Sequence, residues 1–130
     1  MKGYVANLEQ ATLANTDYRR VLYTAKNSQL VLMSLRPGEE IGEEIHRLDQ
    51  FIRFEAGEAK VVLDGVEHLV KADDAVIIPE GTKHNVINAG PADLKLYSIY
   101  SPPEHRDGTV HKTKAKAAEE HFDGKTTEAR

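Results

Sequence analysis

The sequence predicts an all-β fold, a jelly-roll barrel or sandwich, followed by a short C-terminal helix. Many short runs of branched and large apolar residues alternate with turns that contain Gly, Pro, Asn or Asp, as expected between antiparallel strands. No internal repeat of fixed period interrupts this pattern. A chain of 130 residues can bury one core without disulfides, so we expect a single domain over residues 1–130.

The composition is typical of a soluble protein without a nucleic-acid partner. The net charge is −4, with acidic and basic residues interspersed, which disfavours binding to a phosphate backbone. The chain has no cysteine, which excludes disulfides, thiolate metal ligands and a cysteine nucleophile. It shows neither the apolar run of a signal peptide nor a stretch long enough to cross a membrane. We therefore expect a cytoplasmic protein with no membrane partner.

The expected strands form a core barrel over about residues 18–101, and each strand ends at a turn signal. The second run is broken by Pro37-Gly38, and the fourth ends at Asp64-Gly65, a dipeptide typical of tight hairpins. The expected strands are residues 18–26, 28–36, 50–55, 58–63, 66–70, 75–78, 84–88 and 94–100.

The two ends of the chain have a different character. A tail over residues 102–130 begins with Pro102-Pro103, and its residues 114–121 favour a short helix packed on the barrel. Residues 4–13 could wrap the barrel or exchange with a second subunit. Because a small jelly roll exposes edge strands that proteins usually cover, we expect a homodimer.

Polar side chains in two distant segments are the candidates for chemistry. Glu44 and His46 lie two residues apart on an expected strand, so both project from one face while Ile45 projects from the other. Gln50 opens the next strand, and His84 follows a Pro-Glu-Gly turn much later in the chain. If the two segments face each other across a barrel, these four nitrogen and oxygen donors converge at an enclosed cavity.

These segments resemble the two sequence motifs of the cupin superfamily. The first motif is matched by Gly38, Glu44, His46, Gln50 and Gly57. The second is matched by Pro79-Glu80-Gly81, His84 and Asn88, with Asp73 in place of the usual glycine. The resemblance covers the central part of the chain. It implies a small single-domain cupin with the type-2 conserved barrel, a double-stranded β-helix.

The resemblance also implies a metal site with an altered ligand set. The family usually presents two His, a Glu and a third His; here Glu44 stands at the first His position and Gln50 at the Glu position, while His46 and His84 match. Two imidazoles and a carboxylate form the ligand set of non-haem Fe(II) sites. Gln50 would add a weak carbonyl ligand or hydrogen-bond a bound water. Such a mixed set suits Fe, Mn, Ni, Zn or Co without choosing among them.

Three functions stay open on this evidence. The first is a metal-dependent isomerase or oxygenase, with Glu44 as metal ligand or, if unbound, as general base. The second is a barrel that binds a sugar or another small molecule without catalysis, and the third is a dimeric scaffold without metal. Under the last two, Glu44 and His46 would form a polar strand face and His84 would hydrogen-bond across the barrel.

Further polar residues are secondary candidates. Asp49 is a fallback carboxylate if its turn points inward. His105 and His111, in the tail, could cover the barrel mouth or lie at a subunit contact. Alternatively, they belong to a solvated turn that follows the rigid Pro102-Pro103 segment at the end of the barrel.

Overall fold

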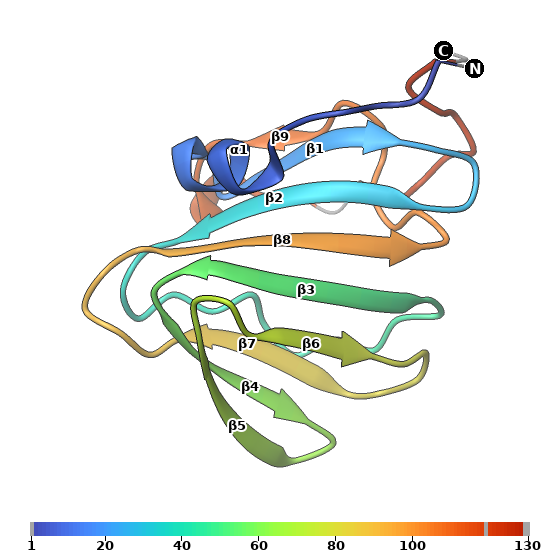
Figure 1. The fold of residues 1–130 in the computed structure, drawn as a ribbon. Helices are drawn as coiled ribbons and strands as arrows, with labels where there is room; N and C mark the ends of the chain where they lie inside the picture. The colour runs from blue at the N-terminus through green and yellow to red at the C-terminus, as the bar shows by residue number, and fades with distance from the viewer. Residues whose placement is uncertain (1, 119, 129–130) are drawn as a thin grey trace.

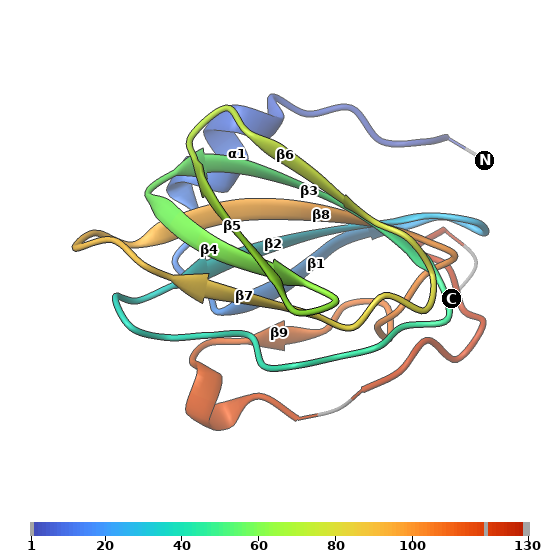
Figure 2. The ribbon, with the colours of Figure 1, turned by 90° about the horizontal axis from the view of Figure 1, so that it is seen from below.

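Two antiparallel β-sheets lie face to face in the computed structural model, which describes residues 2–118 and 120–128 (Figures 1 and 2). Their strands are β1 (Arg19–Thr24), β2 (Gln29–Leu35), β3 (Asp49–Ala56), β4 (Glu58–Leu63), β5 (Val66–Lys71), β6 (Ala75–Ile78), β7 (His84–Asn88), β8 (Leu94–Ser101) and β9 (Val110–His111). The larger sheet has the order β6-β3-β8-β2-β1-β9, and the smaller has the order β5-β4-β7. The all-β fold and eight predicted strands are confirmed, and their bounds differ by two residues at most.

The core fills the space between the sheets because side chains alternate along each strand. On β3 and β8, every second residue is buried. Ile52 and Phe54 of β3 pack there against Val61 of β4 and Val86 of β7, and all four are buried almost completely. The hairpin between β4 and β5 turns at Asp64 and Gly65, both with positive φ, as a two-residue turn of this type requires.

The predicted C-terminal helix over residues 114–121 is wrong. Only a single 3₁₀ turn, η1 (Lys114–Lys116), forms there, and Glu119 lies outside the described residues. The turn buries no residue, and so short a segment without an apolar face gains too little to continue as a helix. His121 instead forms an isolated β-bridge with His105, and β9 adds an unforeseen strand of the tail to the edge of β1.

The helix of this fold lies at the N-terminus. α1 (Leu8–Ala14) begins at Asn7, whose side chain accepts a hydrogen bond from the amide of Gln10 at 3.0 Å. It contacts β3 and β8, so this segment packs on the barrel of its own chain. No helix within the described ranges is long and apolar enough to cross a membrane.

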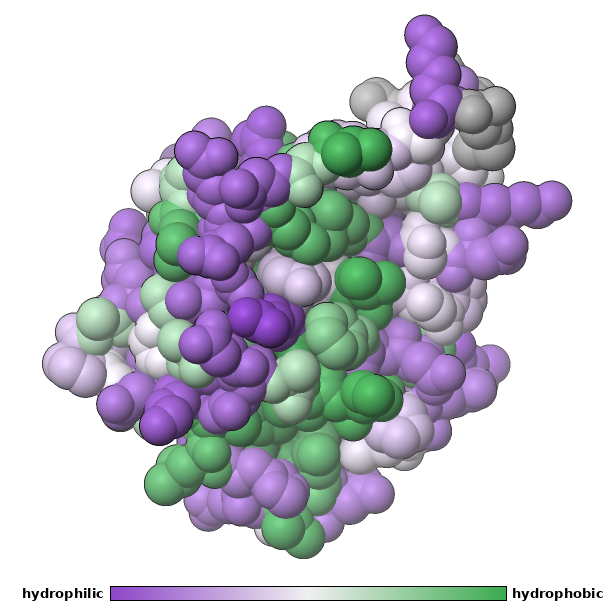
Figure 3. Space-filling model, viewed as in Figure 1, coloured by the Kyte–Doolittle hydropathy of each residue, from purple (hydrophilic) through white to green (hydrophobic). Residues whose placement is uncertain are grey.

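Apolar side chains remain exposed on the surface. Val66, Leu69 and Ile77 are each more than half exposed, and Figure 3 shows apolar residues gathered over the strands drawn in the lower half of Figure 1. This exposed surface is compatible with a subunit contact, and the homodimer stays a prediction.

Substitution of Gly57, at the turn between β3 and β4, tests how tightly this turn is packed. Gly57 has φ +91°, and an added Cβ would lie 2.8 Å from the carbonyl oxygen of Asp93. We expect Gly57→Ala to lower the free energy of unfolding by at least about 2 kcal/mol, measured by urea denaturation. Gly38→Ala is the matched control: it has φ +81° but open space around it, so only the backbone cost of about 1 kcal/mol applies. Equal losses in the two variants would contradict the packing argument.

Candidate metal centre

The segment between β2 and β3 runs beside β7 and extends the small sheet irregularly. Ile41 donates its amide to the carbonyl of Val86 at 2.9 Å. Glu44 and His84 then exchange both backbone hydrogen bonds, each at 2.9 Å, as an isolated antiparallel bridge. This pairing sets two residues that are distant in sequence directly opposite each other.

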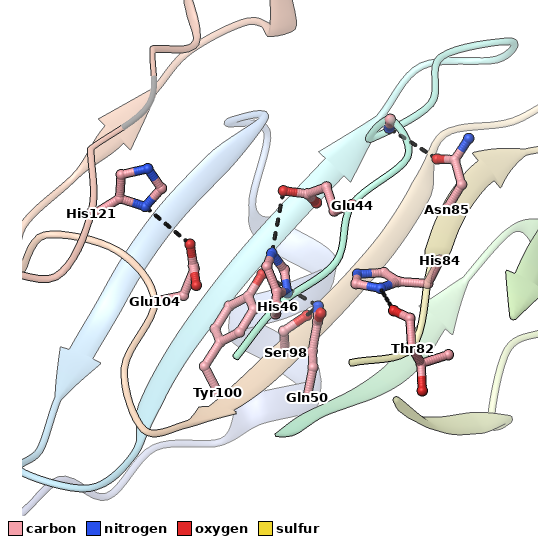
Figure 4. Close-up of polar contacts among 11 residues, drawn as sticks. Glu44, His46, Gln50, Thr82, His84, Asn85, Ser98, Tyr100, Glu104 and His121 are labelled. Carbon is pink, nitrogen blue, oxygen red and sulfur yellow. Dashed lines mark hydrogen bonds and ion pairs between the residues drawn. The ribbon is translucent and has the colours of Figure 1, made fainter. Parts of the chain in front are cut away.

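The side chains of this bridge and of His46 form one cluster (Figure 4). Glu44 Oε2 lies 3.3 Å from His46 Nε2, and the ring centroids of His46 and His84 are 5.0 Å apart. One ligand atom from each of the three residues lies within 4.8 Å of the others. Ile45 is 63% exposed, so the expected alternation holds even though these residues form no regular strand.

Gln50 lies beneath this cluster, where the end of its side chain reaches between the two imidazoles (Figure 4). Its amide nitrogen donates to Ser98 Oγ at 3.1 Å and to Tyr100 Oη at 3.3 Å. These two bonds fix the orientation of the amide. Gln50 Oε1 is buried beside His46, and the two side chains share a hydrogen-bond contact.

The donors present fit a divalent metal ion. His84 Nδ1 lies 2.9 Å from the carbonyl of Thr82, which fixes the Nδ1–H tautomer and leaves the lone pair of Nε2 free, as in most metal-binding histidines. His46 Nδ1 and Gln50 Oε1 are both buried, and the two side chains share a hydrogen-bond contact. Two imidazoles, a carboxylate and an amide oxygen form a mixed nitrogen and oxygen donor set of the kind that binds transition metals.

Comparison with known proteins agrees with this geometry. The family model described as "Cupin domain" matches residues 31–100, more than half of the chain. The chain belongs to the cupin family. This cupin is 50% identical over 123 residues to the uncharacterised protein YrkC of Bacillus subtilis, covering 89% of this chain and 66% of that protein.

Solved structures extend the likeness to the fold. The crystal structure of BH2720 from Bacillus halodurans superposes with a TM-score of 0.86 at 47% identity, covering 88% of this chain and 92% of that one. A structure titled as a predicted oxalate decarboxylase from Thermotoga maritima has a TM-score of 0.57 at 24% identity, covering 59% of this chain and 68% of that one. The second likeness concerns the fold alone.

Neighbouring charges and burial change the pKa values of Glu44 and His46 in this cupin. Burial raises the pKa of Glu44, but the hydrogen bond with His46 and the nearby positive charges outweigh it, so the pKa falls below its usual range. For His46 the balance is reversed: burial lowers its pKa, and the Glu44 carboxylate more than compensates and raises it. Glu44 is therefore ionised at neutral pH, as a metal ligand must be.

A hollow of about 250 Å³ opens beside Glu44 rather than between the two polar segments. The segments touch directly, so the cavity that the sequence predicted between them is displaced toward the tail. The two histidines of the tail lie on the barrel side of their segment. His105 lines this hollow, and its ring packs edge-on against Tyr100 with centroids 5.2 Å apart. His111 is buried on β9, where its Nδ1 lies 3.2 Å from Arg19 Nη1. The tail thus covers the barrel mouth, one of the roles considered for its histidines.

The other sequence candidate stays outside the cluster. Asp49 is exposed and accepts the amide of Glu80 at 2.9 Å. Conversely, the sequence did not identify Arg19, Ser98 or Tyr100 as residues of the site. The period-two pattern of their strands could have placed them inward, since each lies two residues from a buried neighbour on the same face.

Burial of His105 predicts an acid-dependent loss of stability. Burial and the nearby Arg19 lower the pKa of His105 to about 3, whereas the unfolded chain protonates it near about 6.5. Between these values the unfolded state binds the extra proton, so the free energy of unfolding falls as the pH falls. His105→Gln should reduce this slope by up to about 1.4 kcal/mol per pH unit, measured by urea denaturation from pH 7 to pH 4.

His68, which is exposed on β5, provides the control for this measurement. His68→Gln should leave the slope unchanged. If His105→Gln and the parent protein lose stability at the same rate as the pH falls, His105 is not held neutral by burial.

Proposed function

We propose that this cupin binds a divalent transition metal and uses it to bind or transform a small molecule. Glu44, His46 and His84 would be the ligands, with Gln50 Oε1 as a fourth ligand or as the partner of a bound water. The observation that carries the proposal is that ligand atoms from the three residues lie within 4.8 Å of one another. Their mixed nitrogen and oxygen donors suit Fe, Mn, Ni, Zn or Co.

A bound metal would act as a Lewis acid on a carbonyl or hydroxyl oxygen of the small molecule, or hold it beside oxygen. The chain's own residues support isomerase-like or dioxygenase-like chemistry around such a centre. Ile52, Phe54 and Val86 seal the barrel behind the cluster and exclude water. Glu44 is the cluster residue that lines the hollow, and 39% of its side chain is exposed. If Glu44 does not bind the metal, it is placed to accept or return a proton at a carboxylate oxygen.

A binding function without metal has one observation in its favour. Glu44 and His46 already satisfy each other at 3.3 Å, as a purely structural ion pair would. A measurement of metal affinity distinguishes the two functions, because only the first requires that the protein bind a metal ion.

The first test measures metal in protein purified without chelator, followed by titration with Fe(II), Mn(II), Ni(II), Zn(II) and Co(II). We expect one metal ion per chain, and we expect His46→Ala and His84→Ala each to weaken metal binding by at least about 100-fold, because each removes a ligand. His68→Ala, which removes an exposed histidine outside the cluster, should bind metal like the parent. A parent protein that neither carries nor acquires a transition metal refutes the metal function and leaves the binding or scaffold function.

The Gln50→Glu variant tests the role of the amide. Gln50 is 3% exposed, so a carboxylate there is costly without a cation, and we expect the metal-free variant to lose about 1–3 kcal/mol of stability. A metal ion would offset this cost, so saturating metal should raise the melting temperature of Gln50→Glu more than that of the parent. Gln50→Met, which has no strong ligand atom, is the control. Equal metal-induced shifts in all three proteins would show that position 50 does not face the metal.

A further inference from the structure

The hollow beside Glu44 contains an arginine that the metal cluster does not use. Arg19 opens β1 and points to the same side as the buried Val21, into the hollow, whereas Arg20 points away and is exposed. Arg19 is half-buried, and its positive charge contributes to the lowered pKa of Glu44. The guanidinium of Arg19 is therefore close enough to interact electrostatically with Glu44, one of the proposed metal ligands.

Among the described residues, the guanidinium of Arg19 contacts His111 and Tyr18. Its Nη1 donates to His111 Nδ1 at 3.2 Å, and its carbon lies 5.2 Å from the ring centroid of Tyr18, in a cation–π contact. No carboxylate of the described residues lies within ion-pairing distance of it, and its Nε–H is buried without a hydrogen-bond partner. Because a partly buried cation without an anion is costly, a bound carboxylate would stabilise this arginine.

A second donor lies in the same wall. His105 lines the hollow, and its Nε2 is also buried without a partner among the described residues. Its backbone is held in place because both its amide and its carbonyl bond to the side chain of Gln29, at 2.9 and 2.7 Å. Its ring is braced against Tyr100. His105 is therefore a fixed wall residue rather than part of a solvated turn.

The acidic residues of the hollow are already engaged. Glu104 pairs with His121 Nδ1 at 3.2 Å, and Glu120 accepts from Thr109 Oγ1 at 3.0 Å. Both keep free lone pairs that could accept from hydroxyl groups of a ligand. Lys114, which also lines the hollow, donates to the carbonyl of Glu40. The volume of about 250 Å³ is below that of pockets for drug-sized molecules and limits the ligand to a small metabolite.

We propose that Arg19 and His105 form an anion subsite beside the metal cluster, and that the ligand of this cupin is a small hydroxy-carboxylic acid. The carboxylate would bind the Arg19 guanidinium, and hydroxyl groups would face Glu104 and Glu120. The opposite end of the acid would lie near Glu44, where the proposed metal binds. The inference rests on the proposed function only for this last contact, because Arg19 and the hollow exist independently of the metal.

The test compares acids with neutral molecules of the same shape. Lactate is paired with propane-1,2-diol and gluconate with sorbitol, and binding is followed by amide NMR titration to about 20 mM on Zn(II)-loaded and chelator-stripped protein. We expect at least one acid to bind saturably, and its neutral counterpart to bind at least about tenfold more weakly, since a charged hydrogen bond is lost. Arg19→Gln should weaken the acid by a similar factor, while Arg20→Gln should leave its affinity unchanged.

Arg19→Lys keeps the charge without the planar fork and should bind the acid with intermediate affinity. It also keeps the test decisive if Arg19→Gln does not fold, which circular dichroism would reveal. The subsite is refuted if no acid binds saturably, if acids and their neutral counterparts bind alike, or if Arg19→Gln and Arg19→Lys both keep the parent affinity.

The two metal states separate this inference from the proposed function. Acid binding through Arg19 in a protein that takes up none of the five metal ions would refute the metal function and support the subsite. Zn(II) binding that depends on His46 and His84, without acid binding, would support the metal function and refute the subsite.

Discussion

The site depends on one piece of backbone pairing, the antiparallel bridge between Glu44 and His84. The segment that carries Glu44 and His46 is too irregular to count as a strand, and Gly42 within it has φ +111°. Two reciprocal hydrogen bonds at 2.9 Å nevertheless fix it to β7, and Gly81 donates its amide to the carbonyl of His46 at 3.0 Å. This pairing, which continues the bridge between Glu40 and Ile87, brings Glu44 and His46 of the first motif beside His84 of the second.

The barrel beneath the bridge has a polar end and an apolar end. Along β3, the inward positions run from Gln50 through Ile52 to Phe54, and each is paired with an inward residue of β8. Gln50 stands opposite Tyr100, whereas Phe54 stands opposite Leu96. The same strands therefore close the core at one end and supply hydrogen bonds to the site at the other. The apolar end gives the site a rigid floor, which holds donor atoms in place without a metal.

Charge is distributed unevenly around this polar end. Glu44 and His46 compensate each other within the cluster, whereas the closest described contacts of Arg19 across the hollow are with His111 and Tyr18. A divalent ion at the cluster would add positive charge to a cavity that already holds this arginine. If the proposed metal is bound, these two positive charges would attract the anionic end of the proposed ligand, a preference that the cupin fold alone does not specify.

By itself, the sequence predicted eight of the strands, their inward faces, and Glu44, His46, Gln50 and His84 as candidate members of one site. These features are local: strand alternation and turn residues such as Asp64-Gly65 are set by neighbours along the chain. The spacing of the two motifs then sufficed to predict the cupin barrel. The C-terminal helix was predicted wrongly because helix propensity is a weak determinant in a tail that gains more from β9 and the His105–His121 bridge.

Only the tertiary structure decided what surrounds the four residues. Arg19 and His105 are far from them in sequence, and the path of the tail over the barrel mouth brings His105 to them, a path that no local pattern encodes. Because of this path, the cavity lies beside Glu44, and not between the two motifs as the sequence predicted. Long-range packing, which depends on the whole chain at once, therefore decides which charges a ligand meets, whereas short-range periodicity decides which residues face inward.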